Sequence, residues 1–114
     1  MQIPKQAVLL RIFIGEDDKF GTSPLYQAIV LKARELHLAG ATVSRGAMGF
    51  GKSSRLHTAK ILRLSDDLPL VIEIVDSEDN INHFLPTLDE MMTTSGLITL
   101  EKVQVLQYGE KETG

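Results

Sequence analysis

The chain has 114 residues, of which 43% are hydrophobic and 24% charged, and its formal net charge is -3 at pH 7. The negative charge argues against a nucleic-acid-binding protein. The sequence contains no run of about 18 apolar residues, so no transmembrane helix is predicted. The absence of cysteine excludes disulfides and thiolate metal sites. We therefore expect one cytoplasmic domain over residues 1–114, with its core at about 7–108 and a flexible tail at 109–114.

A strand and a helix are the first predicted elements. Residues 7–14 alternate between two faces that are both apolar apart from Arg11. After a polar loop at 15–22, Ser23 suits the N-cap of a helix and Pro24 its first position. Gly40 is placed to end that helix.

A hairpin and a second clear strand follow. Residues 41–50 predict one arm, 51–55 a polar tip, and 57–64 the beginning of the returning arm. Residues 70–75 alternate with the period of a strand.

The last predicted elements are a second helix and a final strand. Asp76 and Ser77 precede the helix and suit its N-cap. Pro86 lies inside the helix, so we expect a kink or a brief break there. Gly96 ends this segment, and residues 97–108 predict the last strand.

The order β-α-β-β-α-β predicts an α+β, ferredoxin-like fold: an antiparallel four-stranded sheet with two helices on one face. The second face of the two central strands is also apolar, because it carries Leu9, Phe13, Val71 and Val75. A patch of this kind is typical of a partner surface, and a closed homo-oligomeric ring is the simplest way to bury it.

Two charged residues, Arg11 and Glu73, interrupt this second face in strands that are neighbours in the predicted topology. We expect them to pair, because an unpaired buried charge costs several kcal/mol. The alternative is that both face solvent.

Residues 46–53 match the phosphate-loop pattern G-x-x-x-x-G-K-[ST]. A true phosphate loop needs a buried strand before it, a helix after it and a parallel sheet, for which this chain is short. The same glycines could instead let the backbone approach phosphates, with Lys52, Arg45 and Arg55 supplying positive charge. A solvated hairpin tip is the third interpretation.

The histidines and hydroxyl residues predict neither a metal site nor a catalytic centre. The three histidines are scattered without ligand spacing, and no serine or threonine near the tip has an adjacent base. His57 is a candidate for ligand contact, whereas His37 and His83 are expected on helix surfaces.

Several stretches of the sequence resemble known proteins. The runs 40–43, 49–52 and 68–76 resemble PII signalling proteins. From about Val8 to Tyr108 the chain resembles more closely the PII-like group called domain of unknown function 190. The stretches that carry this closer resemblance are Leu10-Arg-Ile-Phe-Ile-Gly15-Glu16, Leu38-Ala-Gly-Ala-Thr42-Val43, Arg45-Gly46, Met48-Gly49-Phe50-Gly51, His57-Thr-Ala-Lys60-Ile61-Leu62 and Phe84-Leu-Pro86…Leu88-Asp89-Glu90.

The resemblance implies a homotrimer with its sheets lining the three-fold axis and an adenine nucleotide in clefts between subunits. It implies that Thr42 lies near adenine, and that Lys102 approaches phosphate from the start of the last strand. Thr99 and Glu101 stand where PII proteins have glycines, and no arginine pair follows the strand; these departures favour AMP, ADP or another adenylate over a triphosphate. The complete predicted nucleotide-binding set is Thr42, Arg45, Gly49, Phe50, Gly51, Lys52, Arg55, His57 and Lys102.

We therefore expect a regulatory protein without catalytic residues or required cofactors. Adenylate binding would order residues 51–58, whose conformation a protein partner would recognise. By resemblance alone that partner is a membrane transport protein, a fluoride exporter, because genes of this group often lie beside fluoride-exporter genes. The alternatives are a small nucleotide-hydrolysing enzyme that uses residues 46–53, and a structural or metal-responsive trimer resembling the CutA group.

Overall fold

The structure, a computed structural model, describes residues 4–46, 48–49, 57–58, 68–93 and 96–109. The predicted tail at 109–114, apart from Gly109, lies outside these residues, as do positions 51–55 of the predicted hairpin tip and most of its returning arm.

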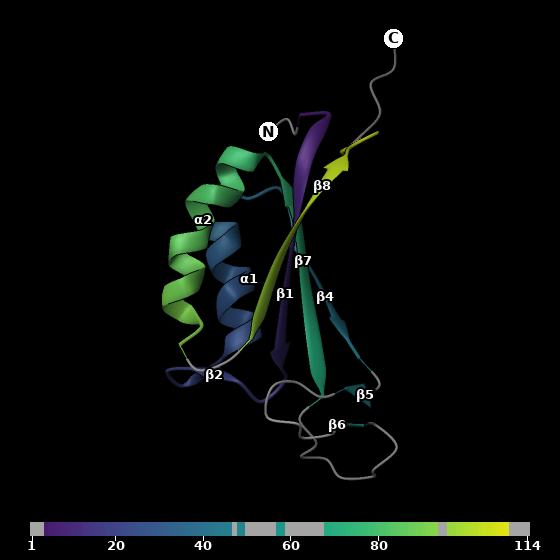
Figure 1. Cartoon of the computed structure of the whole chain (residues 1–114). Helices are drawn as coiled ribbons and strands as arrows, with labels where there is room; N and C mark the ends of the chain where they lie inside the picture. Colours follow the sequence, from purple (N-terminus) through teal and green to yellow (C-terminus); the bar gives the residue numbers. More distant parts are fainter. Residues whose placement is uncertain (1–3, 47, 50–56, 59–67, 94–95, 110–114) are drawn as a thin grey trace.

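A four-stranded antiparallel sheet, in the order β4-β7-β1-β8, is covered on one face by two helices (Figure 1). This arrangement confirms the predicted α+β, ferredoxin-like fold. Two further pairs, β2 with β3 and β5 with β6, lie outside the main sheet. The elements are β1 (Gln6–Gly15), β2 (Lys19–Phe20), β3 (Ser23–Pro24), α1 (Leu25–Glu35), β4 (Thr42–Arg45), β5 (Met48–Gly49), β6 (His57–Thr58), β7 (Pro69–Asp76), α2 (Glu78–Met91) and β8 (Leu97–Gln104).

The hydrophobic core lies between the helices and one face of β1 and β7. Alternate residues of these strands point toward the helices, since side chains of a strand alternate between its faces. The helices contribute residues at the spacing that keeps them on one side. The side chains with less than 2% exposure are Leu10, Ile12, Ile72 and Ile74 from the strands and Ile29, Ile81, Phe84 and Leu88 from the helices.

The junction between β7 and α2 depends on two adjacent polar residues. Ser77 is the N-cap of α2, and its side-chain oxygen accepts a hydrogen bond from Asn80 N, as predicted. Asp76 is fully buried, and its carboxylate accepts hydrogen bonds from Ser77 N (2.6 Å), Asn80 Nδ2 (3.1 Å) and Ala39 N (2.9 Å). Asp76 thus joins the segment after α1 to the start of α2 without leaving a buried charge unpartnered.

Both ends of α1 differ from the prediction. Its N-cap is Pro24 and no side chain caps the helix, because Ser23 and Pro24 pair as β3 with β2 and Leu25 N donates to Asp18 O. At its other end the helix stops at Glu35, before Gly40, and His37 takes the positive φ of 62° that closes the last turn. His37 and His83 are both exposed, but only His83 lies on a helix, because His37 follows the end of α1.

Of the kink or brief break predicted at Pro86, the break is wrong, since α2 is continuous from Glu78 to Met91. A proline in a helix leaves the carbonyl four residues earlier without its amide partner. Here that residue is Asn82, and both Asn82 and Pro86 are on the exposed side of the helix, where water can bond the carbonyl.

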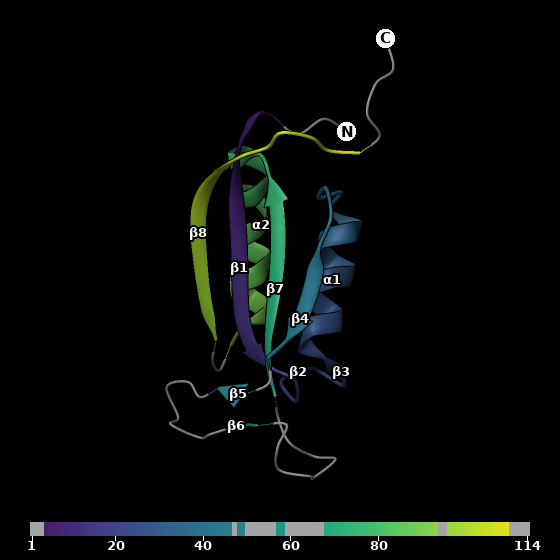
Figure 2. The same cartoon turned by 90° about the vertical axis from the view of Figure 1, so that its right-hand side faces the viewer.

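The last strand is shorter than predicted, because β8 ends at Gln104 and not at Tyr108. The chain then crosses the ends of β1 and β7 (Figure 2). Val105 N donates to Lys5 O, and the Tyr108 hydroxyl donates to Ala39 O at 2.7 Å. The alternation of Val105, Leu106 and Tyr108 therefore belongs to a crossing segment and not to a strand.

Replacing Ser77 with alanine should lower the free energy of unfolding by about 1 kcal/mol, because the first turn of α2 loses its acceptor. Ser23→Ala is the matched control and should change it by less than about 0.5 kcal/mol. Urea denaturation followed by circular dichroism, at one protein concentration, measures both. A larger loss for Ser23→Ala would contradict Pro24 as the N-cap of α1.

Candidate functional site

The predicted nucleotide-binding residues that the structure describes lie in three places. Thr42 is on β4, at one edge of the sheet, and Lys102 is on β8, at the other edge. Arg45, Gly49 and His57 lie at the end of the sheet where β4 leads into the β5–β6 pair. Phe50, Gly51, Lys52 and Arg55 lie outside the described residues.

Thr42 and Lys102 are separated by the full width of the sheet. Because β7 and β1 lie between their strands, the two backbones are about 14 Å apart at the usual strand spacing. Thr42 pairs with Glu73 on the open face, whereas Lys102 pairs with Val8 on the helix-covered face. Within one chain these two side chains do not meet at one ligand.

The structure brings Gly49 and His57 together. β5 and β6 pair in antiparallel fashion, with Gly49 opposite His57 and Met48 opposite Thr58. A phosphate loop would need residues 53 onward to form a helix, but His57 and Thr58 are in a strand. The described residues before and after positions 50–56 therefore form an antiparallel strand pair, and His57 and Thr58 do not continue a helix that would follow a phosphate loop.

Arg45, which the sequence suggests is a free cation, is paired with Glu16. Its Nε lies 2.5 Å from Glu16 Oε2, with 59% of the arginine side chain and 27% of the glutamate side chain exposed. Glu16 follows directly after β1 and is 29 positions earlier in the sequence, so no local pattern links the two residues. The contact could not be predicted from the sequence.

Lys102 lines a cavity of about 310 Å³ next to the first turn of α2. This volume is at the lower end of the range for small-molecule sites. The lysine lies in the second half of β8, so its expected place at the start of the last strand is wrong. The lining residues, which provide an ammonium group, a carboxylate and amides, are Gln6, Ala7, Val8, Glu78, Lys102, Val103 and Gln104.

Figure 2 turns the open face of the sheet toward the viewer, and no helix among the described residues covers it. It carries the four apolar residues predicted for this face, with Leu9 opposite Val75 and Phe13 opposite Val71. Leu9 is buried and the other three are half-buried. The structure therefore leaves an apolar surface on β1 and β7 that neither helix covers.

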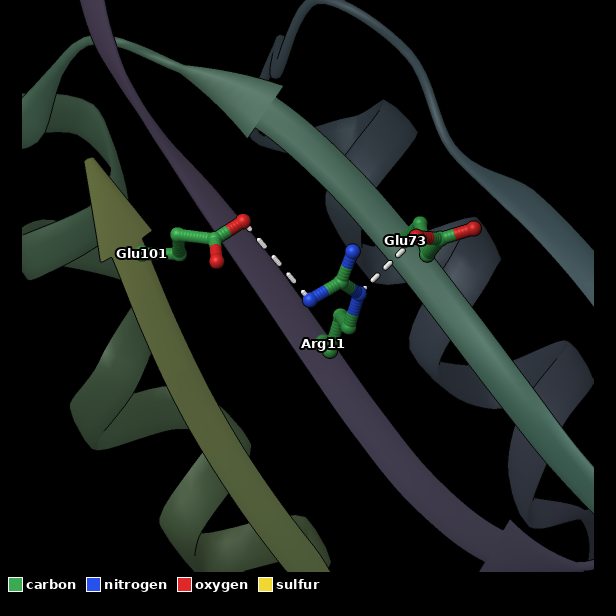
Figure 3. Close-up of polar contacts among 3 residues, drawn as sticks. All are labelled: Arg11, Glu73 and Glu101. Atoms are coloured by element: carbon green, nitrogen blue, oxygen red, sulfur yellow. Dashed lines mark hydrogen bonds and ion pairs between the residues drawn. The ribbon is translucent and has the colours of Figure 1, made fainter. Parts of the chain in front are cut away.

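A cluster of three charges lies at the centre of the open face (Figure 3). Arg11 Nε donates to Glu73 Oε2 at 3.0 Å, which confirms the predicted pair. The same guanidinium approaches Glu101 Oε2 through Nη1 at 3.7 Å. In the sequence, Glu101 stands out only as a departure from a glycine, because the strand register that brings it to Arg11 is set by tertiary structure.

The described part of the chain shows neither a candidate metal site nor a candidate membrane-spanning helix. There, no group of three or more histidine, aspartate and glutamate side chains could hold a metal ion. No helix among these residues is long and apolar enough to span a membrane.

Solved structures share this arrangement of sheet and helices. CPII, a nitrogen regulatory PII-like protein from Thiomonas intermedia K12 bound to ADP, AMP and bicarbonate, aligns with a TM-score of 0.62 and 16% identity over 90% of both chains. GlnK from B. subtilis, in complex with ATP, aligns with a TM-score of 0.57 and 15% identity over 90% of this chain and 85% of its own. At these identities the likeness establishes a PII-like fold.

Residues 7–105 match the family DUF190, described as "Uncharacterized ACR", and the chain belongs to that family. A UPF0166 protein from Aquifex aeolicus (strain VF5) is 42% identical over 98 residues, which are 86% of this chain and 91% of the relative. UPF0166 protein MJ1524 from Methanocaldococcus jannaschii is 38% identical over 100 residues, 88% of this chain and 92% of the relative. The resemblance found in the sequence is confirmed.

Replacing Glu73 with glutamine should lower the free energy of unfolding by about 0.5–1 kcal/mol, because Arg11 loses its close ion pair in a partly exposed setting. Glu101→Gln is the matched control, since its contact with Arg11 is longer and more exposed, and should cost less. Urea denaturation at one protein concentration compares them. A greater cost for Glu101→Gln would contradict the ranking.

Proposed function

We propose that this chain is a PII-like regulatory protein: a cytoplasmic homotrimer that binds an adenine nucleotide, AMP or ADP, in clefts between subunits. The ligand would act through the short segment at 51–58, which a protein partner recognises. The proposed role is binding and not catalysis. It rests on the family membership, on the PII-like fold, and on the ADP and AMP bound by CPII.

One observation carries the proposal. Thr42 and Lys102 lie on opposite edge strands of the same sheet. A ring brings edges of neighbouring copies together, so the Thr42 edge of one copy can approach the Lys102 edge of the next. A site shared between subunits is then the arrangement that uses both residues, and the cavity beside Lys102 offers room at that edge.

The open face supports the ring. Its apolar residues on β1 and β7 remain partly exposed in one chain, and burial of such a surface favours association by about 25 cal/mol per Å² of apolar area. Arg11 at the centre of this face is paired with Glu73. Burying this pair costs less free energy than burying an isolated charge. A second copy of the same chain is therefore a suitable cover for this face.

The assembly is tested by sedimentation velocity at micromolar concentration, where we expect three times the mass of one chain. Val71→Glu should shift the protein toward single chains, because it places a new charge on the open face. Leu31→Glu is the matched control, since Leu31 is 62% exposed on the outer side of α1, and should leave the trimer intact. A stable single wild-type chain would refute the trimer.

The ligand is tested by isothermal titration with AMP, ADP, ATP and cyclic AMP. We expect binding of AMP or ADP, and Lys102→Ala should weaken it by about tenfold or more, as expected for loss of a charged contact. Lys32→Ala is the control, because Lys32 pairs with Glu35 on the surface of α1. No heat with any adenylate would refute the ligand.

The shared position of the site has its own test. Thr42→Ala and Lys102→Ala proteins should each bind weakly, whereas trimers refolded from a mixture should regain wild-type affinity in part of their sites. Mixing places an intact Thr42 edge beside an intact Lys102 edge. A site contained in one chain would show no such recovery.

A further inference from the structure

The ion pair between Glu16 and Arg45 lies where three segments of the chain meet. Glu16 N donates to Leu68 O at 2.8 Å, and Gly46 N donates to Pro69 O at 2.7 Å. The ends of β1 and β4 are thereby both attached to the start of β7. The backbone of Gly46 lies so close to Pro69 that a Cβ atom added at Gly46 would be 2.8 Å from Pro69 Cγ. The pair is thus held by backbone on both sides.

The two partners of this pair are unequally exposed. The Oε2 atom of Glu16 is buried and has no hydrogen bond of good geometry among the described residues, so the contact with Arg45 is its electrostatic partner. Arg45 has 59% of its side chain exposed, and a guanidinium carries five N–H donors. The arginine can therefore meet a second anion from solvent while the glutamate cannot move away from it easily.

A phosphate group would compete with Glu16 for Arg45. Guanidinium groups bind phosphate through two parallel hydrogen bonds, which a single carboxylate contact at Nε does not match. The arginine is the exposed partner of this pair, so its guanidinium can turn toward a bound phosphate. Glu16 stays in place with its negative charge, so it competes for Arg45 and repels further negative charge.

We propose that Glu16 is a specificity residue of the nucleotide site: it competes with the ligand for Arg45 and selects against nucleotides of higher negative charge. The inference rests on the proposed function, because it takes Arg45 as a contact for the phosphate of an adenylate. It assigns to Glu16 a role in discriminating AMP from ADP and ATP.

Isothermal titration of Glu16→Gln with AMP, ADP and ATP tests this role. Loss of the competing carboxylate should raise AMP affinity about two- to six-fold, from the usual strength of an exposed ion pair. The increase in affinity should grow from AMP to ADP to ATP, because each added phosphate carries more negative charge that the Glu16 carboxylate would otherwise repel. Arg45→Gln should weaken AMP binding, and Glu16→Gln should then give a smaller gain.

Glu35→Gln is the matched control, because it removes one negative charge from the ion pair with Lys32 on α1 and should leave all three affinities unchanged. Thermal unfolding verifies that each variant is folded. If Glu16→Gln does not fold, Glu16→Asp serves in its place: it retracts the carboxylate but keeps its charge, so AMP affinity should rise without the increasing gain toward ATP.

The outcomes separate this inference from the proposed function. If the wild type binds an adenylate and Glu16→Gln behaves like Glu35→Gln, the role of Glu16 is refuted and the proposed function stands. If neither wild type nor Glu16→Gln binds any adenylate, both are refuted. Binding by Glu16→Gln alone supports Glu16 as the competitor.

Discussion

The structure depends on one constraint: apart from Arg11 and Glu73, β1 and β7 are apolar on both faces away from their ends, and the two helices among the described residues cover one of these faces. The helices bury Leu10, Ile12, Ile72 and Ile74 on one side. The other face is left with half-buried aliphatic and aromatic side chains. In one chain, the apolar residues of such a sheet are fully buried only on its helix side.

The charged cluster on the open face also fixes the register of the sheet. Side chains alternate along a strand, so a slip by one residue would turn Arg11 into the core. Such a slip would bury the guanidinium without a partner among aliphatic residues, which costs several kcal/mol. In the correct register, Arg11 lies between the carboxylates of Glu73 and Glu101 (Figure 3).

The sequence predicts those features that depend on local periodicity or capping, such as the two-faced strands and Ser77 at the start of α2. It fails where tertiary contacts decide. Ser23 has the chemistry of an N-cap but is engaged in β3, and β8 ends early because Val105 turns to bond Lys5. For the site, the sequence shows Arg45 as a free cation, since its partner Glu16 is distant in the chain.

The separation of Thr42 and Lys102 at opposite edges gives the proposed assembly a thermodynamic consequence. A ligand that binds only between neighbouring chains binds the assembled state and not the single chain, so it stabilises the ring by mass action. By the same linkage, a change that weakens the open-face contact lowers the apparent ligand affinity at protein concentrations where single chains are populated. Nucleotide binding and subunit association are then two measurements of one coupled equilibrium, with the sheet edges as the place where they meet.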